Sequence, residues 1–219
     1  MAYSRPTLFT NENKFDSIIT KYLTLYNKEF NTEINISTIK GFVAQESGFI
    51  PSAVRYEENI KQYSLGLCQI LPSTAKMFGY NKETENLADA DTSLKYGMKY
   101  FYSQFKQYRT YSNAYASYNA GSVKRTDTGK YINQFYVDMA SLYAKFYYYR
   151  DIIGDNEIAT LTKIQINERK KGTTTPTTGV ISLLNIAEPQ GRINLLLLVG
   201  SMALIGYLIC RSTRGGKNV

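Results

Sequence analysis

Glu46 is the residue of this 219-residue chain whose surroundings best suit acid–base chemistry, because it is the one ionisable group on an otherwise apolar helical face. Ile39, Phe42 and Val43 precede it by seven, four and three positions, a spacing that places side chains on one face of an α-helix. A carboxyl group among apolar neighbours loses hydration of its charged form, so its pKa rises and it keeps a proton near neutral pH. Glu46 is therefore a candidate general acid. The alternative is a helix-end glutamate that only hydrogen-bonds a nearby backbone amide.

Composition excludes several other chemistries. The chain contains no histidine, which excludes histidine-based nucleophilic triads and histidine-ligated zinc sites. Its two cysteines, Cys68 and Cys210, lie in different regions and lack metal-ligand spacing, so we expect no disulfide, no metal site and no cofactor. Acid–base chemistry is therefore left to carboxylates. The formal net charge of +8 suits an anionic surface such as a bacterial wall, a membrane or nucleic acid, without choosing among them.

The elements that would position Glu46 are helices. Its own helix is expected to begin after Ser37, a suitable N-cap, and to end at Gly48. Residues 15–30 precede it as an amphipathic helix, since their apolar side chains recur at steps of three and four. Residues 51–64 are polar and are expected to form a loop with a short helical turn. No period-two pattern indicates a strand.

The rest of the first 150 or so residues also has helical patterns. A short helix opens at Pro72 and closes by Gly79, and another at residues 112–120 ends at Gly121. Asp91 is expected to cap a longer helix. The buried faces of the two remaining long helices are predicted to be Leu94, Met98, Phe101, Phe105 and Tyr108 in the first, and Tyr131, Phe135, Met139, Leu142 and Phe146 in the last, which ends before Gly154.

The C-terminal part has a different composition. After Gly154 the helical pattern decays into a Lys- and Thr-rich stretch typical of a linker. An 18-residue run without charge then starts at Ile193 and ends at Cys210. At about 1.5 Å per residue it spans roughly 27 Å, near the short limit for a bilayer core. The alternative is a buried helix of the main domain. The predicted organisation is an arm (1–14), an all-α domain (15–153), a flexible linker (154–191), one transmembrane helix (192–211) and a basic tail (212–219).

Three blocks of sequence point to one family. They are Gln-Glu-Ser-Gly-Phe at 45–49, Gly-Leu-Cys-Gln-Ile-Leu-Pro-Ser-Thr-Ala at 66–75, and Ala-Ser-Tyr-Asn-Ala-Gly at 116–121. In this order they resemble the lytic transglycosylase domain of the soluble-lytic-transglycosylase type, which is related to goose-type lysozymes. The resemblance covers roughly residues 36–137. It implies a mainly α, lysozyme-like domain that cleaves the glycan strands of peptidoglycan.

The same resemblance implies roles for individual residues. Glu46 would be the single catalytic acid/base, with Tyr118 near its carboxyl group. The substrate-binding residues that it implies along the sugar cleft are Ser47, Gly66, Leu67, Gln69, Tyr118, Asn119 and Tyr131. As alternatives, Gln69 and Asn119 would cap local backbone, and Tyr118 and Tyr131 would be ordinary core residues. Cys68 stands where the family usually has methionine, and it still serves as a small apolar filler.

The resemblance also implies the reaction. The glutamate protonates the glycosidic oxygen and then, as a base, draws a proton from the 6-hydroxyl of the N-acetylmuramoyl residue, which closes a 1,6-anhydro ring without consuming water. A hydrolytic lysozyme, the second choice, needs a second carboxylate about 5 to 9.5 Å away. Glu57, Glu58, Asp89 and Asp91 are candidates, but they lie in polar stretches that we expect to be exposed.

Two rival interpretations remain, and both are binding or structural. In the first, a catalytically degenerate domain only binds glycan, and the presence of Glu46 argues against it. In the second, the chain is a structural membrane protein of a virion or secretion apparatus, which is compatible with an active or an inactive domain. Residues 1–14 lack a signal peptide, and with a C-terminal anchor this fits a phage virion membrane or a bacterial envelope. Basic residues near a membrane span favour its cytoplasmic side. We therefore expect the tail, with Arg211, Arg214 and Lys217, to lie on the inner side of the membrane and the catalytic domain to lie outside, facing the wall. The expected partners are peptidoglycan and lipid, and no nucleic acid.

Overall fold

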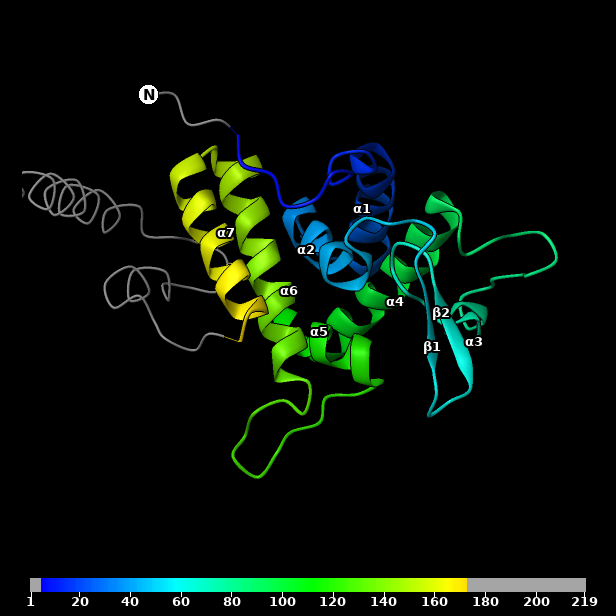
Figure 1. Ribbon diagram of the computed structural model, residues 1–219. Coiled ribbons are helices and arrows are strands. Elements are labelled where there is room, and N and C mark those ends of the chain that lie inside the picture. The colour runs from blue at the N-terminus through cyan, green and yellow to red at the C-terminus, as the bar shows by residue number, and fades with distance from the viewer. Residues whose placement is uncertain (1–4, 173–219) are drawn as a thin grey trace, which may run out of the picture. The chain divides into compact units, whose positions relative to one another are not determined.

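The computed structural model describes residues 5–172, and in this part the chain is mainly helical with one two-stranded antiparallel hairpin (Figure 1). The elements are α1 (Asp16–Phe30), α2 (Ile36–Ser47), β1 (Val54–Glu57), β2 (Gln62–Leu65), α3 (Pro72–Lys76), α4 (Ala90–Tyr108), α5 (Tyr111–Ala120), α6 (Gln134–Tyr147), the π-helical turn η1 (Tyr148–Ile153) and α7 (Asn156–Lys170). The predicted mainly helical architecture is confirmed.

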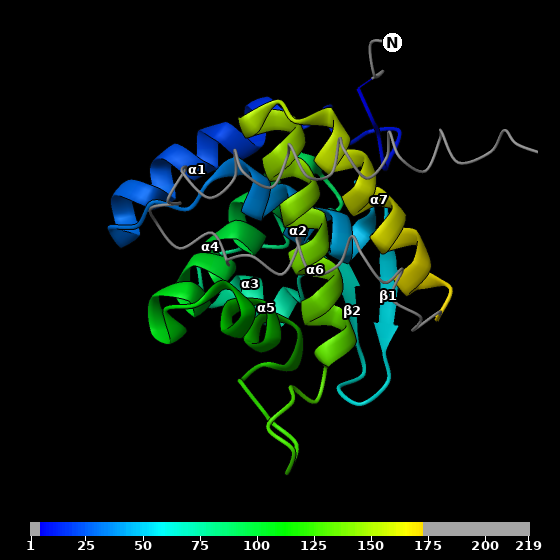
Figure 2. The same ribbon diagram turned by 90° about the vertical axis from the view of Figure 1, so that its left-hand side faces the viewer.

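Helix α2 is the buried helix around which this part is built. Every residue from Ser37 to Ala44 is buried, and the helix packs along α6 and also contacts α1 and η1 (Figures 1 and 2). The approach to α6 is close, since a Cβ added at Gly41 would lie 2.5 Å from the backbone nitrogen of Ala144. Glycine is therefore required at position 41. The close packing that it permits fixes the position of the Glu46 end of α2 relative to α6.

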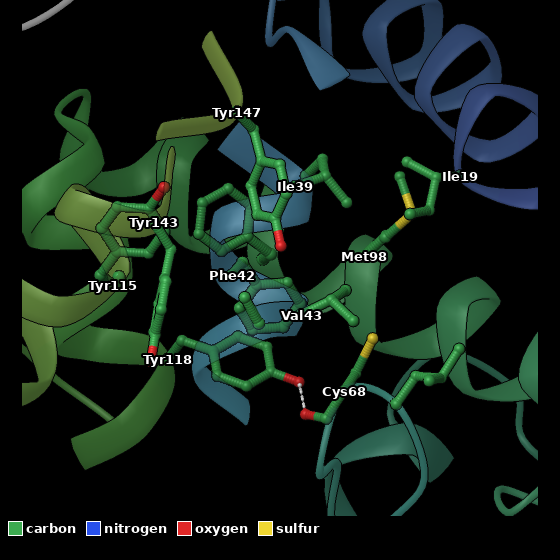
Figure 3. Close-up of a cluster of buried hydrophobic side chains, with 14 of the residues drawn as sticks. Ile19, Ile39, Phe42, Val43, Cys68, Met98, Tyr115, Tyr118, Tyr143 and Tyr147 are labelled. Carbon is green, nitrogen blue, oxygen red and sulfur yellow. Dashed lines mark hydrogen bonds between the residues drawn. The ribbon is translucent and has the colours of Figure 1, made fainter. Parts of the chain in front are cut away.

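The predicted apolar face of α2 is part of the core. Ile39, Phe42 and Val43 are fully buried and lie among aromatic residues from α5 and α6 (Figure 3). The Phe42 ring meets the Tyr118 ring edge-on, with centroids 4.5 Å apart. Edge-to-face pairs of this kind add stability beyond the area that they bury. The helical spacing in the sequence therefore identified the buried side of α2 correctly.

Two helix starts differ from the prediction. Asn35 caps α2 in place of Ser37, and Asp89 caps α4 in place of Asp91; each accepts a hydrogen bond from the backbone N–H three residues further on. Ser37 donates to the Asn35 side chain at 2.6 Å, and Asp91 forms an ion pair with Lys21 at 2.8 Å. Two suitable cap residues lie two positions apart at each site. Local sequence does not decide between them; at α4 the long-range ion pair with Lys21 engages Asp91, whereas at α2 Ser37 hydrogen-bonds the cap residue Asn35 itself.

The hairpin corrects the expectation for residues 51–64. Strands β1 and β2 pair in a register that joins Val54 to Leu65 and Tyr56 to Tyr63, and the rings of the second pair lie 4.9 Å apart. Each strand is only four residues long, half of these residues are exposed, and the buried one is the polar Ser64. With so short a run and no buried apolar face, the period-two pattern is too weak to separate from a loop.

The last predicted helix is present, but its buried face agrees with the predicted one only at Met139 and Phe146. Helix α6 continues through η1 to Gly154, which has φ +77° and ends it as predicted. Phe135 is 55 % exposed and Tyr131 precedes the helix. The residues that α6 buries are Val137, Met139, Ala140, Tyr143, Phe146 and Tyr147. The reason is that α6 packs against α2, α5 and α7, so its buried face is set by more than one neighbour.

A further helix occupies the first part of the expected linker. Helix α7 packs against α6 and buries Ala159, Thr162 and Ile166. Its buried positions include small and hydroxyl side chains, which explains why no apolar stripe indicated a helix here. None of the helices within residues 5–172 is both long and apolar enough to cross a membrane. The run 193–210 that was predicted to do so lies outside the described residues.

Candidate active site

Glu46 lies one residue before the C-terminal end of α2. The helix ends at Gly48, whose φ is +59° and whose N–H donates to the carbonyl of Ala44 at 3.1 Å. Glycine adopts this left-handed conformation without strain, so it ends the helix as the sequence predicted. The Glu46 side chain, which is partly buried, therefore lies where the buried helix comes to the surface.

Tyr136 is the direct partner of Glu46. Its phenolic hydroxyl, from the first turn of α6, donates a short hydrogen bond to Glu46 Oε1. The close packing of α2 on α6 at Gly41 brings these two residues together across 90 positions of sequence. Tyr136 was not among the site residues predicted from the sequence, which included Tyr131 instead. The spacing of Tyr136, three and four residues before the buried Met139 and Ala140, is the signal that could have identified it.

The environment of Glu46 suits a proton donor. Loss of hydration on burial raises the pKa of its carboxyl to about 8, although the hydrogen bond from Tyr136 and the positive charge of Arg55 lower it and the negative charge of Glu57 raises it further. Glu46 therefore holds a proton at neutral pH. Tyr136 occupies Oε1, and no hydrogen bond within residues 5–172 engages Oε2. The proton accordingly has a free oxygen to occupy.

The second sequence block forms a tight loop beside Glu46. The Ser47 hydroxyl donates to the carbonyl of Leu67 at 2.8 Å, which ties this loop to the end of α2. Gly66 has φ +75°, and a Cβ there would lie 2.1 Å from the carbonyl oxygen of Leu87. The Gln69 amide donates to the carbonyls of Ala53 and Gly66 at 2.9 and 3.0 Å. Gln69 thus caps local backbone, and the side chain of Leu67 is fully buried.

Tyr118 locks the same loop to the core. Its hydroxyl donates to the carbonyl of Cys68 at 2.8 Å (Figure 3), and its ring packs on Phe42. Burial raises the pKa of Tyr118 well above its ordinary value, and the charges of Cys68 and Glu46 raise it further. Tyr118 is therefore close enough to sense the Glu46 charge, as expected. Its hydrogen bond, however, goes to the loop backbone.

Asn119 and Tyr131 lie at the junction of α5 and α6. The exposed Asn119 accepts a hydrogen bond from Asn133 at 2.9 Å. Tyr131 donates to Asn113 at 2.6 Å, and the Arg125 guanidinium lies 4.1 Å from the centre of its ring. These contacts hold the loop of residues 121–133 in place. Tyr131 thus supports this loop, whereas the hydroxyl that reaches Glu46 belongs to Tyr136.

The four candidate second carboxylates have different environments. Asp89 caps α4, Asp91 pairs with Lys21, and Glu58 is exposed in the hairpin turn. Glu57 is the one of these four whose charge acts on Glu46. Its Oε1 lies 3.2 Å from the Ser64 hydroxyl, which holds it on the hairpin. Glu57 is therefore the carboxylate to test if water rather than a sugar hydroxyl attacks.

Comparison with known families agrees with this geometry. The model of the family described as "Transglycosylase SLT domain" matches residues 24–136, which is more than half of the chain. The matched range contains all three sequence blocks and Glu46, and it ends at Tyr136. No curated protein sequence matches the chain.

Proposed function

The chain belongs to the transglycosylase SLT family of peptidoglycan lytic transglycosylases, and we propose that Glu46 is the single acid/base with which it cleaves the glycan strands. The observation that carries this proposal is the Glu46 carboxyl group itself. It is protonated at neutral pH because burial raises its pKa to about 8, and its Oε1 is held by Tyr136. A general acid is most effective when its pKa lies near the working pH.

In the first step of the proposed reaction, Glu46 Oε2 donates its proton to the oxygen between N-acetylmuramic acid and N-acetylglucosamine. The bond from the muramoyl C1 to this oxygen breaks, and positive charge develops on the muramoyl ring. Glu46 becomes a carboxylate at this point. The hydrogen bond from Tyr136 then becomes charge-assisted and is stronger than in the neutral state.

In the second step, the Glu46 carboxylate takes the proton of the muramoyl 6-hydroxyl, whose oxygen attacks C1. This closes a 1,6-anhydro ring, returns the proton to Glu46 and consumes no water. One acid/base residue is enough for both steps, because the group that gives the first proton recovers the second. This is the reason to prefer a transglycosylase over a hydrolase with two carboxylates.

Digestion of purified peptidoglycan tests this proposal. The wild-type protein should release products that end in 1,6-anhydro-N-acetylmuramic acid, identified by mass spectrometry. Glu46→Gln should lose about 10²- to 10⁴-fold in rate, since the amide keeps the shape but cannot give or take the proton. Glu58→Gln, which changes an exposed glutamate of the hairpin turn, is the matched control and should stay active.

Other outcomes would assign a different function. Reducing-end products that still depend on Glu46 would make the protein a hydrolase, and Glu57→Gln would then identify its base. Wild-type cleavage by Glu46→Gln would exclude Glu46 as the acid. Binding of glycan without cleavage by either protein would support a degenerate glycan-binding module.

We further propose that residues 193–210 anchor the enzyme in a virion membrane or a bacterial envelope, with the catalytic domain facing the wall. The uncharged run and the basic residues after it support this topology. Such an anchored enzyme would open the wall locally, during phage infection or release. Protease added to intact membranes or particles should release an active fragment ending after α7, which ends at Lys170. Protection of the whole domain until the membrane is opened would contradict this topology.

A further inference from the structure

The hairpin has two chemically different faces. Its register places Arg55 opposite Ser64 and Glu57 opposite Gln62, and side chains of alternate residues point to opposite sides of a strand. We call the side formed by Arg55, Glu57, Gln62 and Ser64 the polar hairpin face. The other side is formed by Val54, Tyr56, Tyr63 and Leu65.

The polar hairpin face is directed toward Glu46. Ser64 is buried, and its hydroxyl lies 3.2 Å from Gln69 Oε1, in the loop that Ser47 ties to the end of α2. Two charges of this face, those of Arg55 and Glu57, act on the Glu46 carboxyl. The hairpin contacts and the electrostatics therefore agree on which side faces the catalytic group.

Arg55 is an exposed cation without a partner in the described part of the chain. Within residues 5–172 its side chain makes no ion pair and no hydrogen bond. Other cations contrast with it, since Lys21, Lys95 and Arg150 each pair with a carboxylate. A guanidinium is a planar fork of donors that matches a carboxylate. A free guanidinium on the polar hairpin face, whose charge acts on Glu46, is therefore available to bind an anion.

The substrate carries suitable anions. Each muramoyl residue bears a 3-O-lactyl arm, which ends in a carboxylate when bare and in a peptide with its own carboxylates when substituted. We propose that Arg55 binds a carboxylate on the muramoyl arm next to the cleaved bond and so makes the enzyme prefer carboxylate-bearing glycan. This inference rests on the proposed function, because it takes peptidoglycan as the substrate of the Glu46 site.

Binding of such a carboxylate has a second consequence. In the free enzyme the charge of Arg55 lowers the pKa of Glu46 and thus works against retention of the catalytic proton. A substrate carboxylate paired with Arg55 offsets this positive charge. Recognition of the anion and retention of the proton therefore favour each other.

The test measures binding in the Glu46→Gln background, so that the glycan stays intact. Three glycan preparations are compared: peptide-bearing strands, strands stripped by an amidase to the lactyl carboxylate, and peptide-bearing strands whose carboxylates are converted to amides. Arg55→Gln and Arg55→Lys are the test variants. Lys28→Gln, which removes an exposed cation on α1, is the matched control. Circular dichroism checks that each variant is folded.

Arg55→Gln should bind peptide-bearing strands about tenfold more weakly, as expected for loss of one charge-assisted contact. Arg55→Lys should retain part of the affinity, while Lys28→Gln should match its parent. All variants should bind the amidated strands equally. If Arg55→Gln also weakens binding to the stripped strands, the ligand of Arg55 is the lactyl carboxylate. If it weakens binding only to the peptide-bearing strands, the ligand is a carboxylate of the peptide.

The inference is overturned if Arg55→Gln binds both carboxylate-bearing preparations as tightly as its parent. It is also overturned if the substitution weakens binding to the amidated strands as much as binding to the carboxylate-bearing strands. Because binding needs no turnover, these results stand apart from the cleavage assay. An inactive wild-type enzyme would refute the role of Glu46 and leave the Arg55 measurement valid. A fully active enzyme with no Arg55 dependence would refute this inference alone.

Discussion

The two ends of α2 each carry an ionisable side chain, and the partners of these two side chains differ in charge. Near its N-terminal half, Lys40 is 1 % exposed and contacts Asp16 at 2.9 Å and Asp151 at 3.4 Å. At its C-terminal end, Glu46 has a neutral tyrosine hydroxyl as its direct partner. Within residues 5–172, α2 thus carries a buried charge with opposite charges beside it and a carboxyl group that forms no ion pair.

The paired end belongs to a larger ionic cluster. Arg150 forms ion pairs with Glu12, at short distance, and with Asp151, at 2.6 Å. Asp151 also forms an ion pair with Arg5 at 2.7 Å. Burial alone would raise the pKa of Asp151, but the hydrogen bonds from Arg150 and Arg5 outweigh it and hold this pKa at about 2. Asp151 therefore stays ionised at neutral pH. The ion pairs of the cluster join the segment before α1 to α2 and η1.

The comparison separates a structural role from a chemical one. Buried charges that compensate one another lock segments together and resist titration. A buried carboxyl group without a counter-charge instead titrates near neutral pH, which is a property of catalytic acids. The partners of the ionisable group therefore decide whether it joins segments of the fold, as at Lys40, or titrates near neutral pH, as at Glu46.

Arg150→Met should produce the largest effect on stability. It leaves Glu12 and Asp151 without their main cation, so the free energy of unfolding should fall by about 3 to 5 kcal/mol, measured by urea denaturation. Glycan cleavage per folded molecule should be unchanged, because the cluster does not touch Glu46. Loss of activity in the folded variant would show that the two ends of α2 are coupled.

Glu46→Gln should have the opposite effect on stability. Since the folded pKa of about 8 lies above the ordinary 4.5, the folded state keeps a proton that the unfolded state loses between these values, and wild-type stability falls as pH rises through this window. The variant cannot ionise, so its free energy of unfolding should exceed that of the wild type by an amount that grows from about pH 4.5 to 8 and reaches the order of 1 kcal/mol or more. A difference in Tm that widens over the same pH range would show this. Parallel Tm curves would contradict a raised pKa.

Tyr136→Phe should give the smallest effect, seen in the pH profile. The hydroxyl both lowers the pKa of Glu46 and orients its carboxyl group. Its removal should reduce the cleavage rate by about tenfold, the scale of one hydrogen bond to a charged group. The activity loss near pH 8, where Glu46 gives up its proton, should also move to higher pH. Tyr131→Phe, which loses a bond to Asn113, should leave this part of the profile in place.

The sequence alone determined those features that depend on neighbours along the chain. Ile39, Phe42 and Val43 predicted the buried face of α2, Gly48 predicted its end, and the position of Glu46 followed from both. These are short-range properties, because the helical repeat and the left-handed conformation of glycine act within a few residues. The three blocks also indicated the family, which the match over residues 24–136 confirmed.

Features that depend on which surfaces meet were decided by the tertiary structure. Tyr136 reaches Glu46 because Gly41 lets α2 approach α6. The spacing of Tyr136 from Met139 and Ala140 indicates that it is on a buried face, but it does not indicate this contact. The charge of Arg55 reaches Glu46 through a hairpin too short to be seen in the sequence. Hydrophobic spacing shows that a face is buried, but it does not name the residue on the opposite helix. That choice depends on packing between segments 90 residues apart, and here it completes the immediate surroundings of the catalytic carboxyl.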